Sequence, residues 1–371
     1  MFRIFYANKD TTLYEAYPDY NTGLDEVLEI GKRLGTDGST LLKSRAIVKF
    51  DMTEISASLA KYSKTVNDCK FTLQLFTTDA KNLPSEYNIA IKILGQDWTN
   101  GTGYFNDATN DGASWNVPAS GSNWISGSQY VEIGTSDLYI SGSGKGGNYL
   151  YHSGSSTAPV LVTSESFSYR TTDLNVDVTN QIKIWLSGSN ANSIPNHGFL
   201  VQFSDANEVS DSVTGYIRFF SRDTHTIYVP KLTMYWDNSA FTTGSLTSAN
   251  LESYVIYTNV KPSYKDTEVN KIRIYARDKY PQKSPTNLFP IETVKYLPTT
   301  TYYAVLDAAT DEVIIPYDNI YTKVSCDSTS NYIYMDMNGF MPERYYRLQL
   351  KIVDGFTEQY IDDQIYFKVV R

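Results

Sequence analysis

The sequence has little cysteine and little histidine, which limits the metal and redox chemistry that it can support. It contains two cysteines, Cys69 and Cys326, and three histidines, His152, His197 and His225, in 371 residues. The cysteines lie too far apart for a zinc or redox motif, and the histidines lack metal-ligand spacing. We therefore expect two buried or semi-buried thiols, no metal and no cofactor. The absence of a disulfide framework is compatible with assembly in a reducing compartment.

Positive charge and long apolar runs are also scarce. Lys and Arg number 32 against 41 Asp and Glu, and the formal net charge of −9 argues against general nucleic-acid binding, which relies on clustered basic residues. The N-terminal segment Met1–Tyr6 is too short and too mixed for a signal peptide and is expected to be a strand. No run approaches the roughly eighteen apolar residues of a membrane span. We expect no membrane insertion and no ordinary secretion.

Catalytic motifs are missing as well. The sequence has no Gly-x-Ser-x-Gly elbow, and Ser141–Gly147 lacks the spacing of a phosphate-binding loop, so a mobile loop is expected there. Carboxylate pairs for glycoside hydrolysis are defined by separation in space, so none can be selected from 41 acidic residues. The sequence therefore predicts a non-enzymatic protein, with glycan degradation as a weaker alternative.

One acidic segment partly resembles a calcium-binding loop. Asp107, Asp111 and Gly112 fit the pattern, but Thr109 occupies a ligand position and Pro118 stands where the closing glutamate belongs. An Asx-rich turn is the favoured interpretation.

What the sequence does contain is typical of strands and turns. It has 31 tyrosines and 22 glycines, with abundant Ser, Thr and Asn. Gly198–Trp236 holds three short aromatic and β-branched runs separated by turn residues, which predicts three strands of a β-sandwich. Tyr87–Leu94 and Lys70–Phe76 alternate in the manner of half-buried strands. A helical turn that Asp177 and Thr179 can cap precedes the three runs.

Ser239–Asn250, rich in Ser, Thr and Gly, is the best domain boundary. We expect a jelly-roll β-sandwich at 1–240. About seven short strands without a disulfide predict an immunoglobulin-like β-sandwich at 241–371.

The most interesting candidate site is an aromatic-rich loop region from Trp98 to Tyr130. Its candidate ligand-contacting residues are Trp98, Tyr104, Trp115 and Trp124, set among Gly, Asn, Ser and Asp. Exposed rings of this kind can stack on sugars while amides and carboxylates bind hydroxyls. The favoured alternative is that the rings plug the end of the sandwich or pack on a neighbouring subunit.

A family resemblance rests on motifs spread over most of residues 1–236. These motifs are Ser44–Asp51, Trp98 with Gly101-Thr102 and Trp115-Asn116, Val176–Thr179 leading to Ile184-Trp185, Asn196–Val201, Phe219–Asp223 and Pro230–Tyr235. In order and spacing they resemble the DNRLRE-type jelly-roll domains, which are related to carbohydrate-binding modules. The resemblance implies a jelly-roll fold for the first domain.

The whole chain, including Asn21–Glu26, Gly339–Pro342 and Tyr366–Arg371, is similar to structural proteins of tailed bacteriophage particles. This resemblance implies a virion component assembled in the host cytoplasm, in the head, neck or tail. Its partners would be other virion proteins and copies of itself. The alternative is an adhesin or fibre module that binds a glycan of the host surface.

Overall fold

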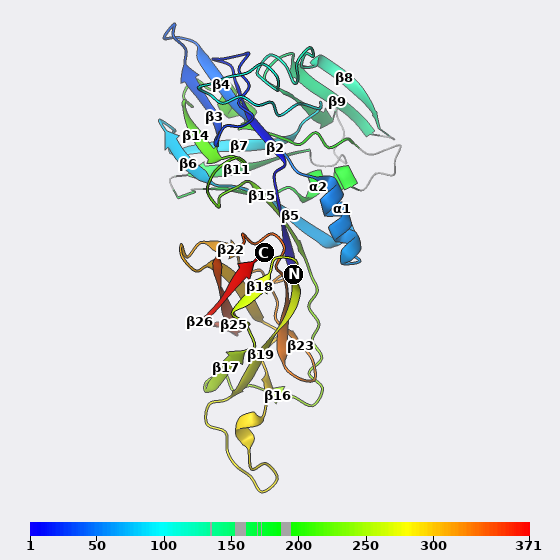
Figure 1. Cartoon of the computed structure of the whole chain (residues 1–371), viewed down its shortest axis with the longest axis vertical. Coiled ribbons are helices and arrows are strands. Elements are labelled where there is room, and N and C mark those ends of the chain that lie inside the picture. The colour runs from blue at the N-terminus through cyan, green and yellow to red at the C-terminus, as the bar shows by residue number, and fades with distance from the viewer. Residues whose placement is uncertain (134–135, 153–160, 169, 172, 187–193) are drawn as a thin grey trace. The chain divides into compact units, whose positions relative to one another are not determined.

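The computed structural model describes two compact units that are both built from β-strands (Figure 1). The residues described are 1–133, 136–152, 161–168, 170–171, 173–186 and 194–371. The N-terminal unit is Phe5–Met234, and the C-terminal unit combines Met1–Ile4 with Tyr235–Arg371. The second unit thus begins a few residues before the Ser-rich segment that the sequence indicates, and it includes the first four residues. Strands make up 47% of the structure and helices 8%, which confirms the all-β sandwich fold.

The larger sheet of the N-terminal unit has eight strands in the order β11-β7-β13-β4-β3-β14-β6, with β2 paired to β4. Its strands are β2 (Lys9–Tyr14), β3 (Val27–Leu34), β4 (Leu41–Lys49), β6 (Thr77–Lys81), β7 (Glu86–Ile93), β11 (Val162–Ser168), β13 (Phe199–Phe203) and β14 (Gly215–Phe220). A four-stranded sheet has the order β1-β15-β5-β12. Its strands are β1 (Phe2–Tyr6), β5 (Cys69–Leu75), β12 (Leu174–Asp177) and β15 (Lys231–Trp236).

The three strands predicted within Gly198–Trp236 are β13, β14 and β15, and all three form. They are not neighbours, however. β4 and β3 lie between β13 and β14, and β15 belongs to the other sheet. Connections that cross between strands and sheets in this way are typical of β-sandwiches.

Alternation correctly identified the core strands. Tyr87, Ile89, Ile91 and Ile93 of β7 are buried, as are the alternate residues Phe71, Leu73 and Leu75 of β5. The helices of this unit are short: α1 (Met52–Lys61), η1 (Val66–Asp68), α2 (Thr179–Leu186) and α3 (Asp205–Val209). The predicted helical turn is α2, where the backbone N–H of Thr179 donates to Asp177 at 2.9 Å. Its Trp185 is buried with the ring centroid 4.9 Å from that of Phe199.

A third, three-stranded sheet in the order β10-β9-β8 overlaps the end of the aromatic-rich loop region and the start of the expected mobile loop. Its strands are β8 (Ser126–Ile133), β9 (Ser136–Ser143) and β10 (Asn148–His152). The prediction of a mobile loop over Ser141–Gly147 is therefore wrong at its start, which belongs to β9. Its end is held in place, because the Gly146 carbonyl accepts a hydrogen bond from Arg45 and its N–H donates to the Trp115 carbonyl at 2.6 Å.

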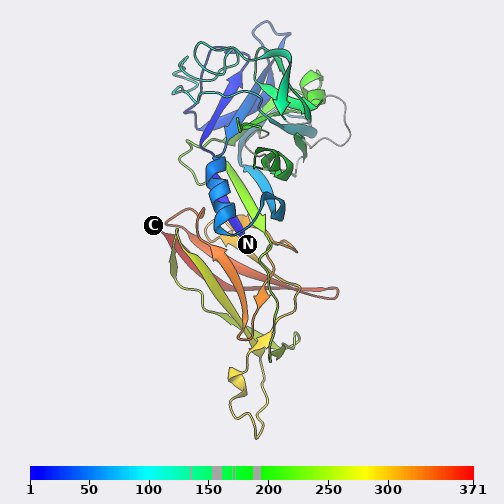
Figure 2. The same cartoon turned by 90° about the vertical axis from the view of Figure 1, so that its right-hand side faces the viewer.

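The C-terminal unit contains two sheets (Figure 2). One has the order β16-β20-β19-β24-β23, with β17 paired to β19, and the other has the order β18-β26-β25-β21-β22. The first comprises β16 (Thr247–Ser248), β17 (Tyr254–Thr258), β19 (Val269–Asp278), β20 (Lys295–Tyr296), β23 (Ser325–Cys326) and β24 (Asn331–Asp336). The second comprises β18 (Ser263–Lys265), β21 (Thr301–Asp307), β22 (Val313–Ile315), β25 (Tyr345–Asp354) and β26 (Thr357–Val370). A 3-10 turn, η2 (Pro290–Glu292), lies between β19 and β20.

Both cysteines are buried free thiols, as expected. Burial raises the pKa of Cys69 and of Cys326 to about 11, so each remains a protonated thiol at neutral pH. None of the helices within the described ranges has the length and apolar character that a membrane crossing requires.

Candidate functional site

The three tryptophans of the predicted site are buried. Trp98, Trp115 and Trp124 are 3%, 6% and 2% exposed, and they share one hydrophobic cluster with Leu13, Ile47, Leu94, Ala113 and Leu200. The indole N–H of Trp98 donates to the His197 carbonyl, and that of Trp124 donates to the Ser114 carbonyl. Because these rings are enclosed, neither face of an indole is available to stack on a sugar. The structure therefore favours packing over ligand binding for these three residues.

One buried side chain, Asn21, explains how a polar, glycine-rich loop can enclose three indoles. Its amide nitrogen donates to the carbonyls of Asn100 and Ala113 at 2.7 and 2.9 Å, and its oxygen accepts from the N–H groups of Gly23 and Gly103. The loop backbone approaches so closely that a Cβ at Gly101, whose φ is +75°, would lie 2.2 Å from the Asn21 oxygen. Glycine is therefore required at this contact.

The acidic segment of the same loop forms hydrogen-bonded turns. The Asp111 carboxylate accepts from the N–H and the hydroxyl of Thr102 at 3.1 and 2.7 Å, and from the hydroxyl of Thr109. The hydroxyls of Thr109 and Thr102 hold the pKa of Asp111 below its usual value. Across the described residues, no three His, Cys, Asp or Glu side chains are grouped so that they could hold a metal ion. The carboxylate of Asp111 therefore stabilises the turns of the loop that covers the tryptophans.

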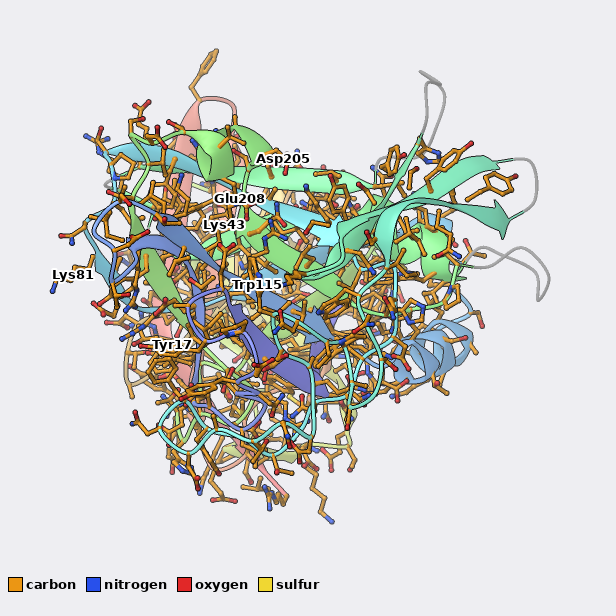
Figure 3. The ribbon with its side chains drawn as sticks, turned by 90° about the horizontal axis from the view of Figure 1, so that it is seen from above. Tyr17, Lys43, Lys81, Trp115, Asp205 and Glu208 are labelled. Carbon is orange, nitrogen blue, oxygen red and sulfur yellow. The ribbon has the colours of Figure 1, made fainter. Side chains whose placement is uncertain are left out.

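Tyr104 differs from the tryptophans because it is 46% exposed. Its neighbour Phe105 packs edge-on against Tyr14 and Tyr17, with ring centroids 5.2 and 5.3 Å apart. Tyr17 in turn stacks on Tyr20 at 5.1 Å, and both rings are partly exposed. Phe105 thus packs on the segment 14–20, whose exposed rings are those of Tyr17 and Tyr20. Figure 3 labels Tyr17 on the outside of this unit.

A small hollow of about 40 Å³, open to solvent, lies beside the rings of Tyr14, Tyr17 and Phe105. It is lined by Tyr14, Ala16, Tyr17, Glu29, Arg33, Leu42, Lys43, Ser44 and Phe105. We call it the Tyr17 hollow. Aromatic walls with a few fixed polar groups are the usual composition of a small-ligand site.

The polar side of the Tyr17 hollow is set by the buried Glu29 carboxylate. Glu29 accepts hydrogen bonds from Arg218 Nε at 2.9 Å, from the Ser44 hydroxyl at 3.1 Å, and from Arg33. Both guanidinium groups also lie over the ring of Tyr216, at 4.0 and 4.6 Å from its centroid. Burial, together with the charge of Glu29, raises the pKa of Tyr14, which keeps that phenol neutral. The hollow therefore offers rings and hydrogen-bonding groups around a carboxylate whose charge is already compensated.

Of the four candidate residues predicted from the sequence, only Tyr104 is exposed, and it is the chain neighbour of Phe105 without lining the hollow itself. The spacing Tyr14, Tyr17, Tyr20, with an aromatic residue at every third position, is a signal that could have drawn attention to the segment 14–20. Nothing in that spacing predicts that Phe105 forms the adjoining wall, because Phe105 comes from a loop about ninety residues away.

No protein-family model matches this chain, and no curated protein matches it either. The resemblance to bacteriophage structural proteins and to DNRLRE-type domains therefore stays a prediction from the residues.

Proposed function

We propose that this chain is a non-enzymatic structural component of a bacteriophage virion, an accessory or decoration protein of the head, neck or tail. It acts through contacts with other virion proteins and with copies of itself, and it is located in virions assembled in the host cytoplasm. The sequence resemblance supports the virion setting. The observation that carries the mode of action is the concentration of exposed apolar and aromatic side chains on projecting segments of the C-terminal unit.

These side chains are large, and they lie on loops and hairpin tips, which are normally polar. Tyr280 and Phe289 are 76% and 70% exposed, and Phe356 is fully exposed. Burying such a side chain in an interface is worth about 1.5–3 kcal/mol before the costs of association. Aromatic anchors on projecting segments are typical of protein interfaces.

The test of this proposal is the composition of purified particles. Quantitative mass spectrometry should find this chain at a fixed ratio to the major capsid or tail proteins, after washes that remove loosely bound protein. If the chain is absent from washed particles, or its amount varies from one preparation to another, the proposal fails.

A second candidate function is glycan binding at the host surface, and the Tyr17 hollow favours it. The exposed rings of Tyr17 and Tyr20, which stack on each other, can also stack on the apolar faces of sugar rings. The groups lining the hollow, including Lys43, can bind the hydroxyls. The location of this candidate site differs from the tryptophan cluster that the sequence suggested.

A glycan array separates this function from purely structural contacts. Wild type should bind a defined set of host glycans, and Tyr17→Ala should weaken that binding by roughly tenfold, the value of one lost stacking contact of about 1.4 kcal/mol. Tyr130→Ala is the matched control, because Tyr130 is comparably exposed on β8 and does not line the hollow. Folded wild type that binds no glycan would remove this candidate and leave the structural role intact.

A further inference from the structure

Two surface segments of the C-terminal unit combine exposed apolar side chains with opposite charge. The first is the segment between β19 and β20, residues 279–293, which we call the apolar loop. Its exposed apolar residues are Tyr280, Leu288, Phe289 and Ile291. Its charged residues are Lys279, Lys283 and Glu292, so it is locally basic in a chain whose formal net charge is −9.

The apolar loop is organised by its own hydrogen bonds. Ser284 and Asn287 exchange backbone hydrogen bonds of 3.0 and 3.1 Å, and the Asn287 side chain donates to the Thr293 hydroxyl at 3.0 Å. The Leu288-Phe289 pair leads directly into η2. Figures 1 and 2 show the loop, drawn in yellow, extending beyond the strands of its unit. A pre-organised loop loses less conformational entropy when it binds.

The second segment is the end of the β25–β26 hairpin, residues 354–366, which we call the acidic hairpin. Its two-residue turn is Gly355-Phe356, and the φ of +59° at Gly355 is one that glycine adopts readily. Phe356 is fully exposed at the tip, and Tyr360 is exposed on the adjoining strand. All the charged residues from 354 to 366 are acidic: Asp354, Glu358, Asp362 and Asp363. Glu358 is paired with Lys351 and Asp362 with Arg347, both on β25, while Asp354 and Asp363 are exposed.

The acidic hairpin is unsuited to strand-to-strand pairing with another chain. The register of β25 and β26 shifts between Leu348 and Leu350, where Leu348 pairs with Ile365 and Leu350 with Ile361. The resulting bulge contains Asp362 and Asp363. Bulges and charges are features that protect sheet edges from further strand addition. A partner would therefore contact this hairpin through side chains, with Phe356 as the projecting apolar group.

The two segments do not meet within one molecule, because Figure 2 draws the yellow apolar loop and the red-brown hairpin well apart on the same unit. We propose that the apolar loop of one copy docks on the acidic hairpin of a second copy. In that contact Leu288 and Phe289 pack against Phe356, while Lys279 and Lys283 face Asp354 and Asp363. The charges select the partner and the apolar side chains supply the affinity.

Such a contact is head-to-tail, because it joins two different surfaces. In a bound pair, one copy keeps a free hairpin and the other a free loop, so the contact repeats into a ring or an open row. This inference deepens the proposed function, since it names one of the protein contacts on which that function rests.

Reciprocal charge reversal tests the contact on purified full-length protein. One variant carries Lys279→Glu and Lys283→Glu, and the other carries Asp354→Lys and Asp363→Lys. Sedimentation equilibrium should show concentration-dependent association of wild type, and each variant alone should associate at least roughly tenfold more weakly, since like charges then face each other. An equal mixture of the two variants should regain association, because each acidic segment then meets a basic one.

Two further variants test the apolar side chains of the proposed contact. Phe289→Ser and Phe356→Ser should each weaken wild-type association by roughly tenfold or more. Tyr257→Ser is the matched control, because Tyr257 is an exposed aromatic residue of β17 outside both segments. Circular dichroism and thermal unfolding would verify that every variant is folded.

A wild-type chain that stays monomeric at the highest attainable concentration would overturn the inference, as would a mixture that fails to regain association. Either result would leave the proposed function standing if washed particles still contain the chain. Loss of the chain from particles, with self-association intact, would instead remove the proposed function alone.

Discussion

The two units treat the aromatic residues of their long loops in opposite ways. In the N-terminal unit, the loop region after β7 folds its tryptophans inward, around the buried Asn21. In the C-terminal unit, the loop after β19 leaves Tyr280, Leu288 and Phe289 outside. An aromatic-rich loop is therefore not a binding surface by composition alone.

The two loops also differ in their glycine and proline content. The first loop has glycine at 101, 103 and 112, and its backbone can approach the Asn21 side chain closely enough to close over the indoles. The second has proline at 281, 285 and 290 and no glycine, which restricts its backbone and removes donors. We expect glycine to let the first loop collapse on its own side chains and proline to hold the second loop open.

The largest expected effect comes from removing a tryptophan of the collapsed loop. Trp124→Ala should destabilise the N-terminal unit by about 3–5 kcal/mol, because it leaves a cavity in the buried cluster. Phe356→Ala should change the stability of the C-terminal unit by less than about 0.5 kcal/mol, because its ring is fully exposed. Urea unfolding followed by circular dichroism would measure both. Similar losses for the two variants would contradict the contrast between the units.

The next largest loss of stability is expected when Asn21 itself is replaced. Asn21→Ala should cost about 3 kcal/mol, because it leaves the buried carbonyls of Asn100 and Ala113 without their donor. Gly101→Ala should also destabilise, because its new methyl group would collide with the Asn21 side chain. The double variant should lose less than the sum of the two, since the collision is then gone. Strictly additive losses would show that the two residues do not depend on each other.

These contacts also explain how far the sequence could predict the structure. Alternation in β5 and β7 identified their buried residues, because a strand's two faces are encoded in adjacent residues. Burial of Trp98 and Trp124 depends on Asn21, far away in the sequence, and no local pattern contains that hydrogen bond. The β8–β9 pairing was missed because its strands are rich in serine and glycine rather than β-branched residues.

The candidate site, too, could be predicted from the sequence only in part. Tyr104 could be singled out as an aromatic residue in a polar loop, and it is exposed. The Tyr17 hollow could not be predicted, because its walls come from residues 14–17, 29–44 and 105 and meet only in the folded unit. The residues that give the apolar loop and the acidic hairpin their charges are visible in the sequence, but their exposure is not.

The units should also differ in their response to pH. Burial raises the pKa of Asp10, in the N-terminal unit, to about 8 from an ordinary 3.8. The stability that its protonated form contributes is present below pH 3.8 and is lost as the pH rises toward 8. In the C-terminal unit, hydrogen bonds from Arg273 lower the pKa of Asp327. Its contribution is present above pH 3.8 and is lost as the pH falls below that value.

Unfolding of wild type, Asp10→Asn and Asp327→Asn across this pH range would measure the two effects separately. Asp10→Asn should flatten the loss of N-terminal stability between pH 5 and 8, because the amide replaces the neutral carboxyl and can still accept from the Arg222 N–H. Asp327→Asn should flatten the loss of C-terminal stability in acid. An unchanged pH profile in either variant would show that the named carboxyl is not its source.

The smallest effect tests whether proline keeps the apolar loop open. Pro281→Gly and Pro285→Gly should each cost the C-terminal unit about 0.5–1 kcal/mol, mainly because the unfolded chain gains freedom. The N-terminal unit should be unaffected. The more informative readout is amide hydrogen exchange between residues 279 and 293, which should accelerate in both variants as the loop loosens. Slower exchange would mean that the loop had collapsed on Leu288 and Phe289 once glycine allowed it. Proline, rather than the absence of a polar centre such as Asn21, would then be what separates the two loops.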